Sequence, residues 1–183
     1  MGLKTLSDHI MDIFQNALVS GASKIHVTIE ESDSWFAFTV SDNGKGMTED
    51  FLKKVFDPFI TTRDSQVRRV GLGLPFLKQA AEMTGGRVSL ESSPGKGTKV
   101  RASFNMKHVD CQPVGDIAGT LAAIVLSNNS VEITVSRKKK DFQYQLSNVE
   151  LRETLGNLSN PVVMKAVFDI FKELESKLAD ELS

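Results

Sequence analysis

Apolar residues recur at every third or fourth position along several stretches of the chain, which is the spacing of one helix face. Glycine or proline residues stand close to the ends of most of these stretches, where helices commonly begin or end. A shorter helix is predicted where Thr48 stands as a capping residue ahead of Pro58. The predicted helices are residues 6–20, 48–56, 73–84, 114–126 and 161–182.

Other stretches alternate apolar and polar residues or are rich in β-forming residues, which predicts strands with one buried face. The predicted strands are residues 24–31, 35–41, 87–92, 98–106, 131–135 and 142–146. The first two are separated only by a polar turn and are expected to pair as a hairpin. Residues 136–141 are predicted to form the charged tip of a second hairpin. This order of helices and strands predicts an α/β fold: a two-layer α/β sandwich with one mixed sheet and helices on one face.

Composition shifts after about Lys107, which divides the 183-residue chain into two expected parts. Residues 1–107 are predicted to form one domain. Residues 108–183 are predicted to form a small accessory α+β domain that begins with a linker over residues 108–115. The apolar stripe along residues 163–178 predicts a helix docked on its own domain, with a homodimer seam as the alternative.

Charge and composition exclude several classes of protein. The net charge is −1 without a basic stripe, so a nucleic-acid-binding role is not expected. No apolar run approaches the roughly 18–20 residues of a membrane span. Cys111 is the single cysteine, which fits a reducing cytoplasm, and no cluster of histidine and cysteine predicts a zinc or iron site.

The sequence Ser-Asp-Asn-Gly-Lys-Gly-Met at residues 41–47 directly follows a predicted strand. It combines one carboxylate, Asp42, with the two glycines Gly44 and Gly46. A tight loop of this kind brings main-chain N–H groups and one fixed acceptor close to a planar, polar ligand.

Three further motifs surround this loop in the sequence. Asp12 and Asn16 lie one helical turn apart, so their side chains point the same way, and an amide oxygen suits Mg²⁺. The run Gly-Leu-Gly-Leu at residues 71–74 precedes a helix, whose first N–H groups bind phosphate. A second glycine-rich turn at residues 95–98 ends in Thr98.

Together, from Leu6 to Phe104, these four motifs resemble the ATP-binding (Bergerat) fold of the GHKL superfamily. This superfamily includes sensor histidine kinases, type II topoisomerase B subunits, mismatch-repair ATPases and anti-sigma-factor kinases. The sequence Phe-Asp-Pro-Phe-Ile-Thr-Thr-Arg at residues 56–63 is also similar to the phenylalanine box of sensor kinases. The resemblance implies binding of ATP with Mg²⁺.

The resemblance also implies roles for residues around the adenine and the metal. Asn16 would hold Mg²⁺ between the phosphates. Asp12 stands where hydrolysing members have a glutamate that activates water, and its shorter side chain puts that step in doubt. Asp42 would accept the adenine amino proton, and Thr98 would support that contact. Gly44, Gly46 and Met47 would surround the purine.

For the phosphates, the resemblance implies contacts from Gly71, Leu72, Gly73 and Leu74. Residues 61–70 would form a mobile lid, from which Arg63 would reach the γ-phosphate; a solvated lid charge is the alternative for Arg63.

Three functions stay open at this point. The first is a regulatory kinase component that transfers the γ-phosphate to a partner protein. The second is an ATP-hydrolysing conformational switch with Asp12 as its base. The third is a non-catalytic ATP sensor whose second part reports the bound state.

Overall fold

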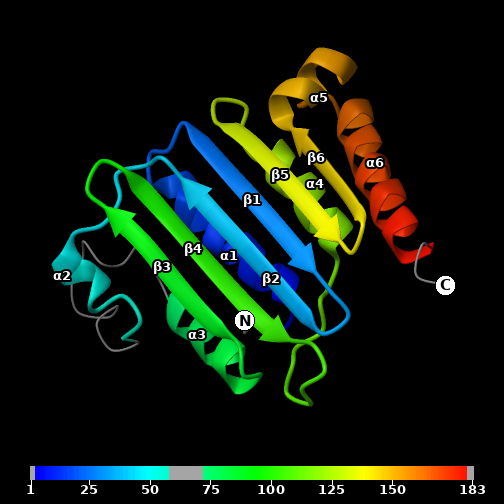
Figure 1. Cartoon of the computed structure of the whole chain (residues 1–183). Coiled ribbons are helices and arrows are strands. Elements are labelled where there is room, and N and C mark those ends of the chain that lie inside the picture. The colour runs from blue at the N-terminus through cyan, green and yellow to red at the C-terminus, as the bar shows by residue number, and fades with distance from the viewer. Residues whose placement is uncertain (1–2, 58–71, 181–183) are drawn as a thin grey trace.

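A computed structural model describes residues 3–57 and 72–180. Within these ranges the chain forms a six-stranded sheet in the order β3-β4-β2-β1-β5-β6 (Figure 1). β1 and β5 are parallel, and the other neighbouring strands are antiparallel, so the sheet is mixed, as predicted. The strands are β1 (Lys24–Glu31), β2 (Trp35–Asp42), β3 (Arg87–Ser93), β4 (Gly97–Asn105), β5 (Glu132–Lys139) and β6 (Phe142–Ser147).

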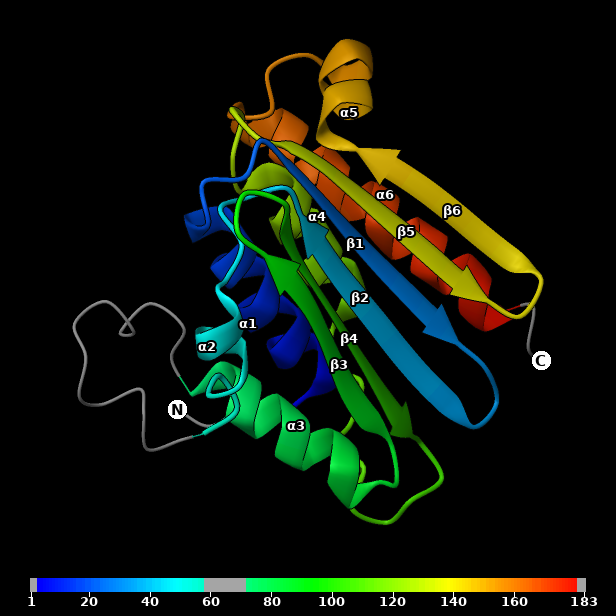
Figure 2. The same cartoon turned by 60° about the vertical axis from the view of Figure 1, so that its left-hand side comes forward.

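One face of the sheet is apolar because alternate residues of its strands are buried. In β1 these are Ile25, Val27 and Ile29, and in β4 they are Val100, Ala102 and Phe104. Helices cover this face and leave the other face to solvent (Figure 2). The covering helices are α1 (Leu6–Val19), α3 (Gly73–Met83), α4 (Ile117–Leu126) and α6 (Pro161–Asp180). The predicted two-layer α/β fold is confirmed.

The first helix begins with a reciprocal cap. The Thr5 side chain accepts a hydrogen bond from the Asp8 N–H, and the Asp8 carboxylate accepts one from the Thr5 N–H. Two further N–H groups of the first turn, those of Leu6 and Ser7, donate to the carbonyls of Pro113 and Val114 at 3.0 and 2.9 Å. The start of α1 is therefore fixed by its own cap and by a segment about a hundred residues later.

The part of the chain after residue 107 continues the same sheet. β5 pairs with β1 along its whole length, from Lys24 opposite Glu132 to Glu31 opposite Lys139. A single hydrophobic cluster contains residues of both parts, among them Val27 from β1 and Val135 from β5. The division into two domains at residue 107 stays a prediction, but the two parts share a sheet and a core. Along the α6 stripe, Val167 and Phe171 are buried in this chain's own core.

The predicted charged tip at residues 136–141 is wrong, because β5 continues to Lys139 and the turn is formed by Lys140 and Asp141. Arg137 is buried and pairs with Glu31 on β1 and with Glu175 on α6. The Tyr144 hydroxyl also donates to Glu175, at 2.6 Å. These carboxylates compensate the charge of Arg137, so β5 can continue through this buried position instead of ending before it.

Other boundaries also differ from the predicted ones. The second helix, α2 (Glu49–Leu52), is shorter than predicted and is followed by turns. α5 (Asn148–Leu155) was not predicted, although Ser147 and Glu150 form a capping box at its start. The predicted lid at residues 61–70 lies outside the described ranges. None of the described helices combines the length and apolarity that a membrane crossing needs.

Candidate functional site

Asp42 lies at the end of β2, where the chain leaves the sheet. Its Oδ1 accepts a hydrogen bond from the Gly44 N–H at 2.8 Å and lies 3.1 Å from the Ser20 hydroxyl at the end of α1. Burial raises the pKa of the Asp42 carboxyl, and the hydrogen bonds from its neighbours oppose this rise. The Asp42 side chain is thus a half-buried hydrogen-bond acceptor that is fixed in place at the sheet edge.

The loop after Asp42 is fixed between α1 and the β3–β4 turn. The Lys45 N–H donates to the Ser20 carbonyl at 3.1 Å, and the Lys45 carbonyl accepts from the Gly95 N–H at 2.8 Å. Gly46 has φ +66°, and a Cβ there would lie 1.9 Å from the Ser93 carbonyl oxygen. Only glycine fits this position, since any side chain would overlap with backbone atoms. The loop therefore has little freedom to move away from the sheet edge.

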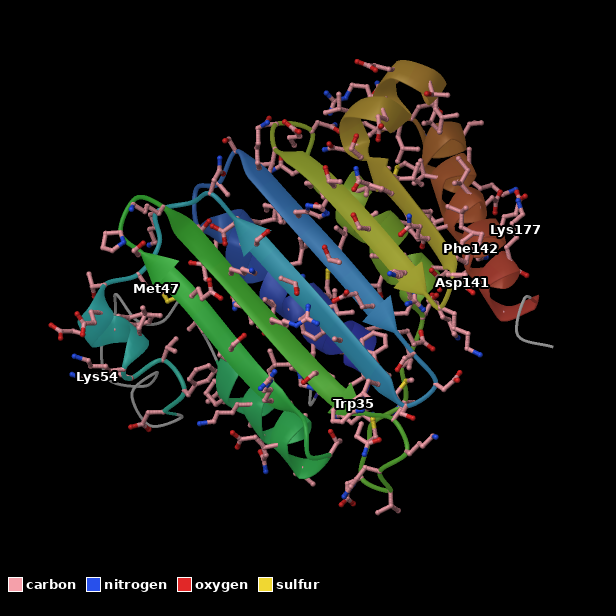
Figure 3. The ribbon with its side chains drawn as sticks, viewed as in Figure 1. Trp35, Met47, Lys54, Asp141, Phe142 and Lys177 are labelled. Atoms are coloured by element: carbon pink, nitrogen blue, oxygen red, sulfur yellow. The ribbon has the colours of Figure 1, made fainter. Side chains whose placement is uncertain are left out.

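A pair of hydroxyl groups lies beside the loop. Ser92 Oγ donates to the Gly97 carbonyl at 2.8 Å, accepts from the Met47 N–H at 2.9 Å and lies 2.9 Å from Thr98 Oγ1. With the single Ser92 proton directed to Gly97, the Thr98 hydroxyl is the donor within the pair. Thr98 Oγ1 then keeps its lone pairs for a ligand or water. Figure 3 shows Met47 beside the end of β3, on the segment that leads from β2 to α2.

Asp12 and Asn16 lie on consecutive turns of α1, and both are partly buried. Burial raises the pKa of the Asp12 carboxyl, while the neighbouring His9 opposes that rise. His9 is buried, and its Nε2 lies 2.9 Å from Gln112 Oε1. Burial in turn lowers the pKa of the His9 imidazole. A carboxylate and an amide one turn apart offer oxygen ligands of the kind Mg²⁺ binds.

The start of α3 lies against Asp12. A Cβ on Gly73 would lie 1.7 Å from Asp12 Oδ2, so this close approach depends on the absence of a side chain. No side chain among the described residues caps the first turn of α3. The N–H groups at the beginning of α3 therefore remain suited to an anion, next to the carboxylate and amide of α1.

The family described as "Histidine kinase-, DNA gyrase B-, and HSP90-like ATPase" matches residues 3–108, which is more than half of the chain. The chain belongs to this family. It carries the ATP-binding domain of a histidine kinase-like ATPase.

Several curated relatives that match this ATPase domain are named as kinases or sensor proteins. Sporulation kinase D of Bacillus subtilis is 30% identical over 104 residues, which cover 54% of this chain and 20% of that protein. Sensor kinase CckA of Brucella abortus is 34% identical over 84 residues, 46% of this chain and 9% of its own length. The sensor protein DctB of Rhizobium meliloti, named for C4-dicarboxylate transport, is 35% identical over 107 residues, 53% of this chain and 17% of that protein. Each match thus spans a fifth of the relative or less.

A solved structure supports the fold over a longer stretch of the chain. The N-terminal domain of a DNA repair protein aligns with a TM-score of 0.60 and 16% identity, covering 88% of this chain and 59% of that one. At this identity the likeness concerns the fold alone.

The structure brings together most of the described residues that the ATPase resemblance implies. Asp42, Gly44, Gly46, Met47 and Thr98 share the loop and strand ends at one sheet edge. Asp12 and Gly73 join α1 to α3.

The remaining predicted residues differ in what they can contribute. The Leu74 side chain is in the core, so only its main chain is available to a ligand, whereas Leu72 is exposed. Arg63 and Gly71 lie outside the described ranges.

Two residues of the site, Ser20 and Ser92, were missed by the sequence analysis. Ser92 lies opposite Thr98 in the β3–β4 hairpin, so pairing the two predicted strands in register would have placed Ser92 beside Thr98. Ser20 lies at a helix end next to a glycine and gives no sequence signal beyond that of a cap. Asn43 ties the loop to the start of β1, because its Oδ1 accepts hydrogen bonds from the N–H groups of Ser23 and Lys24, both at 2.9 Å.

Proposed function

We propose that the chain binds ATP with Mg²⁺ and serves as the nucleotide-binding component of a regulatory kinase that transfers the γ-phosphate to a partner protein. The adenine would lie at the Asp42 loop, with its amino group donating to the carboxylate. The phosphates would extend toward the start of α3, and Asn16 would supply an amide oxygen to Mg²⁺.

The observation that carries the proposal is the contact between Asp12 and Gly73. It joins the helix that would hold the metal to the helix start that would hold the phosphates. A metal ion at Asn16 and uncapped N–H groups on α3 together offset the charge of a triphosphate. The sensor-kinase relatives of the same domain support a phosphotransfer role for the nucleotide.

A second candidate function is an ATP-hydrolysing switch. The raised pKa of Asp12 favours it, because a carboxylate with a higher pKa takes a proton from water more readily. The shorter side chain of aspartate relative to glutamate speaks against it. A homodimer through α6 and a cytoplasmic location stay predictions.

The test follows γ-labelled ATP with Mg²⁺ and the purified chain, measuring bound label, protein-linked label and released phosphate together. We expect stable binding without release, followed by transfer of label to a protein acceptor when one is added. Steady release that is lost in Asp12→Asn, but kept in the control Asp169→Asn on the exposed side of α6, would establish the switch instead. A chain that retains no label would overturn both.

A further inference from the structure

Ser20 is the C-cap residue of α1, and its hydroxyl lies between two acceptors. Oγ is 2.7 Å from the Ala17 carbonyl oxygen and 3.1 Å from Asp42 Oδ1. A hydroxyl group has one hydrogen, so Ser20 donates to only one of these at a time. The shorter distance favours the Ala17 carbonyl as the acceptor of this hydrogen, with the carboxylate as the alternative acceptor. Rotation about one side-chain bond would direct it to the carboxylate.

The end of α4 provides a matched cap without this second acceptor. Ser127 donates from Oγ to the Ile124 carbonyl, also at 2.7 Å and also three residues back. Both residues have helical backbone angles at the cap, φ −73° and ψ −7° for Ser20 and φ −69° and ψ −31° for Ser127. Within the described ranges, Ser20 therefore differs from Ser127 in the nearby carboxylate rather than in how it ends the helix.

We propose that Ser20 is a positioning residue for Asp42, whose hydroxyl turns to the carboxylate when Asp42 accepts the amino group of ATP. It thereby contributes to selection of a purine that donates a hydrogen bond at position 6. This inference rests on the proposed function. A carboxylate held by both the Gly44 N–H and the Ser20 hydroxyl is fixed in direction, and these hydrogen bonds favour its ionised form, which can only accept.

Charged groups around Asp42 do not account for the shift of its pKa. The elements near it carry Asp12 on α1, Lys24 on β1, Lys45 in the loop and Lys99 on β4. Lys24 pairs with Glu132 at 2.9 Å, and Lys45 and Lys99 are exposed. The pKa of Asp42 is instead raised by burial and lowered by hydrogen bonds from Gly44, Ser20 and Thr98. Removing the Ser20 hydroxyl should therefore raise that pKa further.

The experiment measures equilibrium binding of ATP and of inosine triphosphate, whose purine carries a carbonyl at position 6, to the full chain. Ser20→Ala should weaken ATP binding about 3- to 10-fold, the range of one hydrogen bond, and change inosine triphosphate binding less than about twofold. The pH below which ATP affinity falls should move upward in Ser20→Ala. Ser20→Thr, which retains a hydroxyl, should restore both properties, and Ser127→Ala should leave them as in the parent.

Equal losses for the two nucleotides would mean that Ser20 only ends the helix, and would overturn the inference. So would an unchanged ATP affinity in Ser20→Ala together with a large loss in Asp42→Asn, a result that leaves the proposed function intact. A parent chain that binds no ATP would overturn the proposed function, and this inference with it.

Discussion

Asp12 Oδ2 lies 1.7 Å from the place where a Cβ on Gly73 would stand, so the carboxylate of α1 occupies the space that this glycine leaves open. The two residues are more than sixty positions apart in the sequence, yet they fix how α1 meets α3. The N–H groups that would bind phosphate and the side chains that would bind the metal therefore share one small region.

Substituting Gly73 tests this contact. In Gly73→Ala the new methyl group should push the Asp12 carboxylate aside, because a side-chain end moves more easily than backbone. We expect the protein to fold and to bind ATP, with phosphotransfer or hydrolysis reduced about 10- to 100-fold by the misplaced carboxylate. The measurement is the rate of γ-phosphate transfer or release at saturating ATP.

The control is a double-mutant cycle with Asp12→Ala. Once the carboxylate is gone, the space beside Gly73 is open, and Gly73→Ala should cause little further loss. Additive losses in the double variant would show that the two residues act independently and would contradict the assigned contact.

The carboxylate of Asp42 should reduce stability at neutral pH. Its pKa is raised in the folded state, so its contribution is favourable below the unfolded pKa and is lost as pH rises through the folded pKa. Asp42→Asn should therefore melt at a higher temperature than the parent at pH 7 while losing ATP affinity, by about 10-fold or more. The difference in melting temperature should shrink toward pH 3.

Thermal unfolding between pH 3 and pH 7 checks this expectation. The control is Asp141→Asn at the exposed β5–β6 turn, labelled in Figure 3. No rise in melting temperature is expected for this variant. A parent that is more stable than Asp42→Asn at pH 7 would show that the hydrogen bonds outweigh burial.

Arg137 should be among the most sensitive positions in the second half of the chain. Its side chain is 3% exposed and pairs with Glu31 and Glu175, so Arg137→Ala removes the cation between these two carboxylates and leaves Glu31 only Lys139 as a partner. We expect a loss of about 3–5 kcal/mol in the free energy of unfolding, as for a broken buried ion pair. Chemical denaturation provides the measurement.

Arg101 is the matched comparison, because it pairs with Glu30 at 2.8 Å on the exposed face of the same sheet. Arg101→Ala should cost at most about 1 kcal/mol. Similar losses for the two variants would contradict the distinction between a buried network and a surface pair.

Arg137 also illustrates what the sequence could not supply. Helix and strand periodicity predicted most elements, since burial on one face repeats at 3.6 or 2 residues. The charged residues at positions 136–141 predicted a solvated hairpin tip, because charge normally indicates exposure. The carboxylates that compensate Arg137 come from β1 and α6. The sequence around Arg137 does not indicate that these two elements pack against it.

The candidate site shows the same limit of prediction from the sequence. The loop glycines and Asp42 are recognisable because a tight loop after a strand needs glycines at set places, as Gly46 shows. Ser20 contacts Asp42 only because the tertiary fold places the end of α1 beside the end of β2. The missed helix α5 is different, since its capping box, Ser147 with Glu150, stands in the sequence and could have been recognised.

Removing the part of the chain after residue 107 tests the predicted division. A chain of residues 1–107 would lose β5 beside β1 and the Pro113 and Val114 carbonyls that accept from α1. It would also lose Gln112, the partner of His9. We expect it to unfold at much lower denaturant concentration than the full chain, as followed by circular dichroism. Equal stability would show that residues 1–107 form an independent domain.

The most direct test of the central claim is equilibrium binding of ATP to the purified full chain with and without Mg²⁺, by titration calorimetry. We predict one saturable site per chain whose affinity depends on Mg²⁺. The affinity should fall sharply in Asp42→Asn, and its dependence on Mg²⁺ should be lost in Asn16→Ala. Absence of binding in the parent, or binding that both variants retain unchanged, would contradict the account.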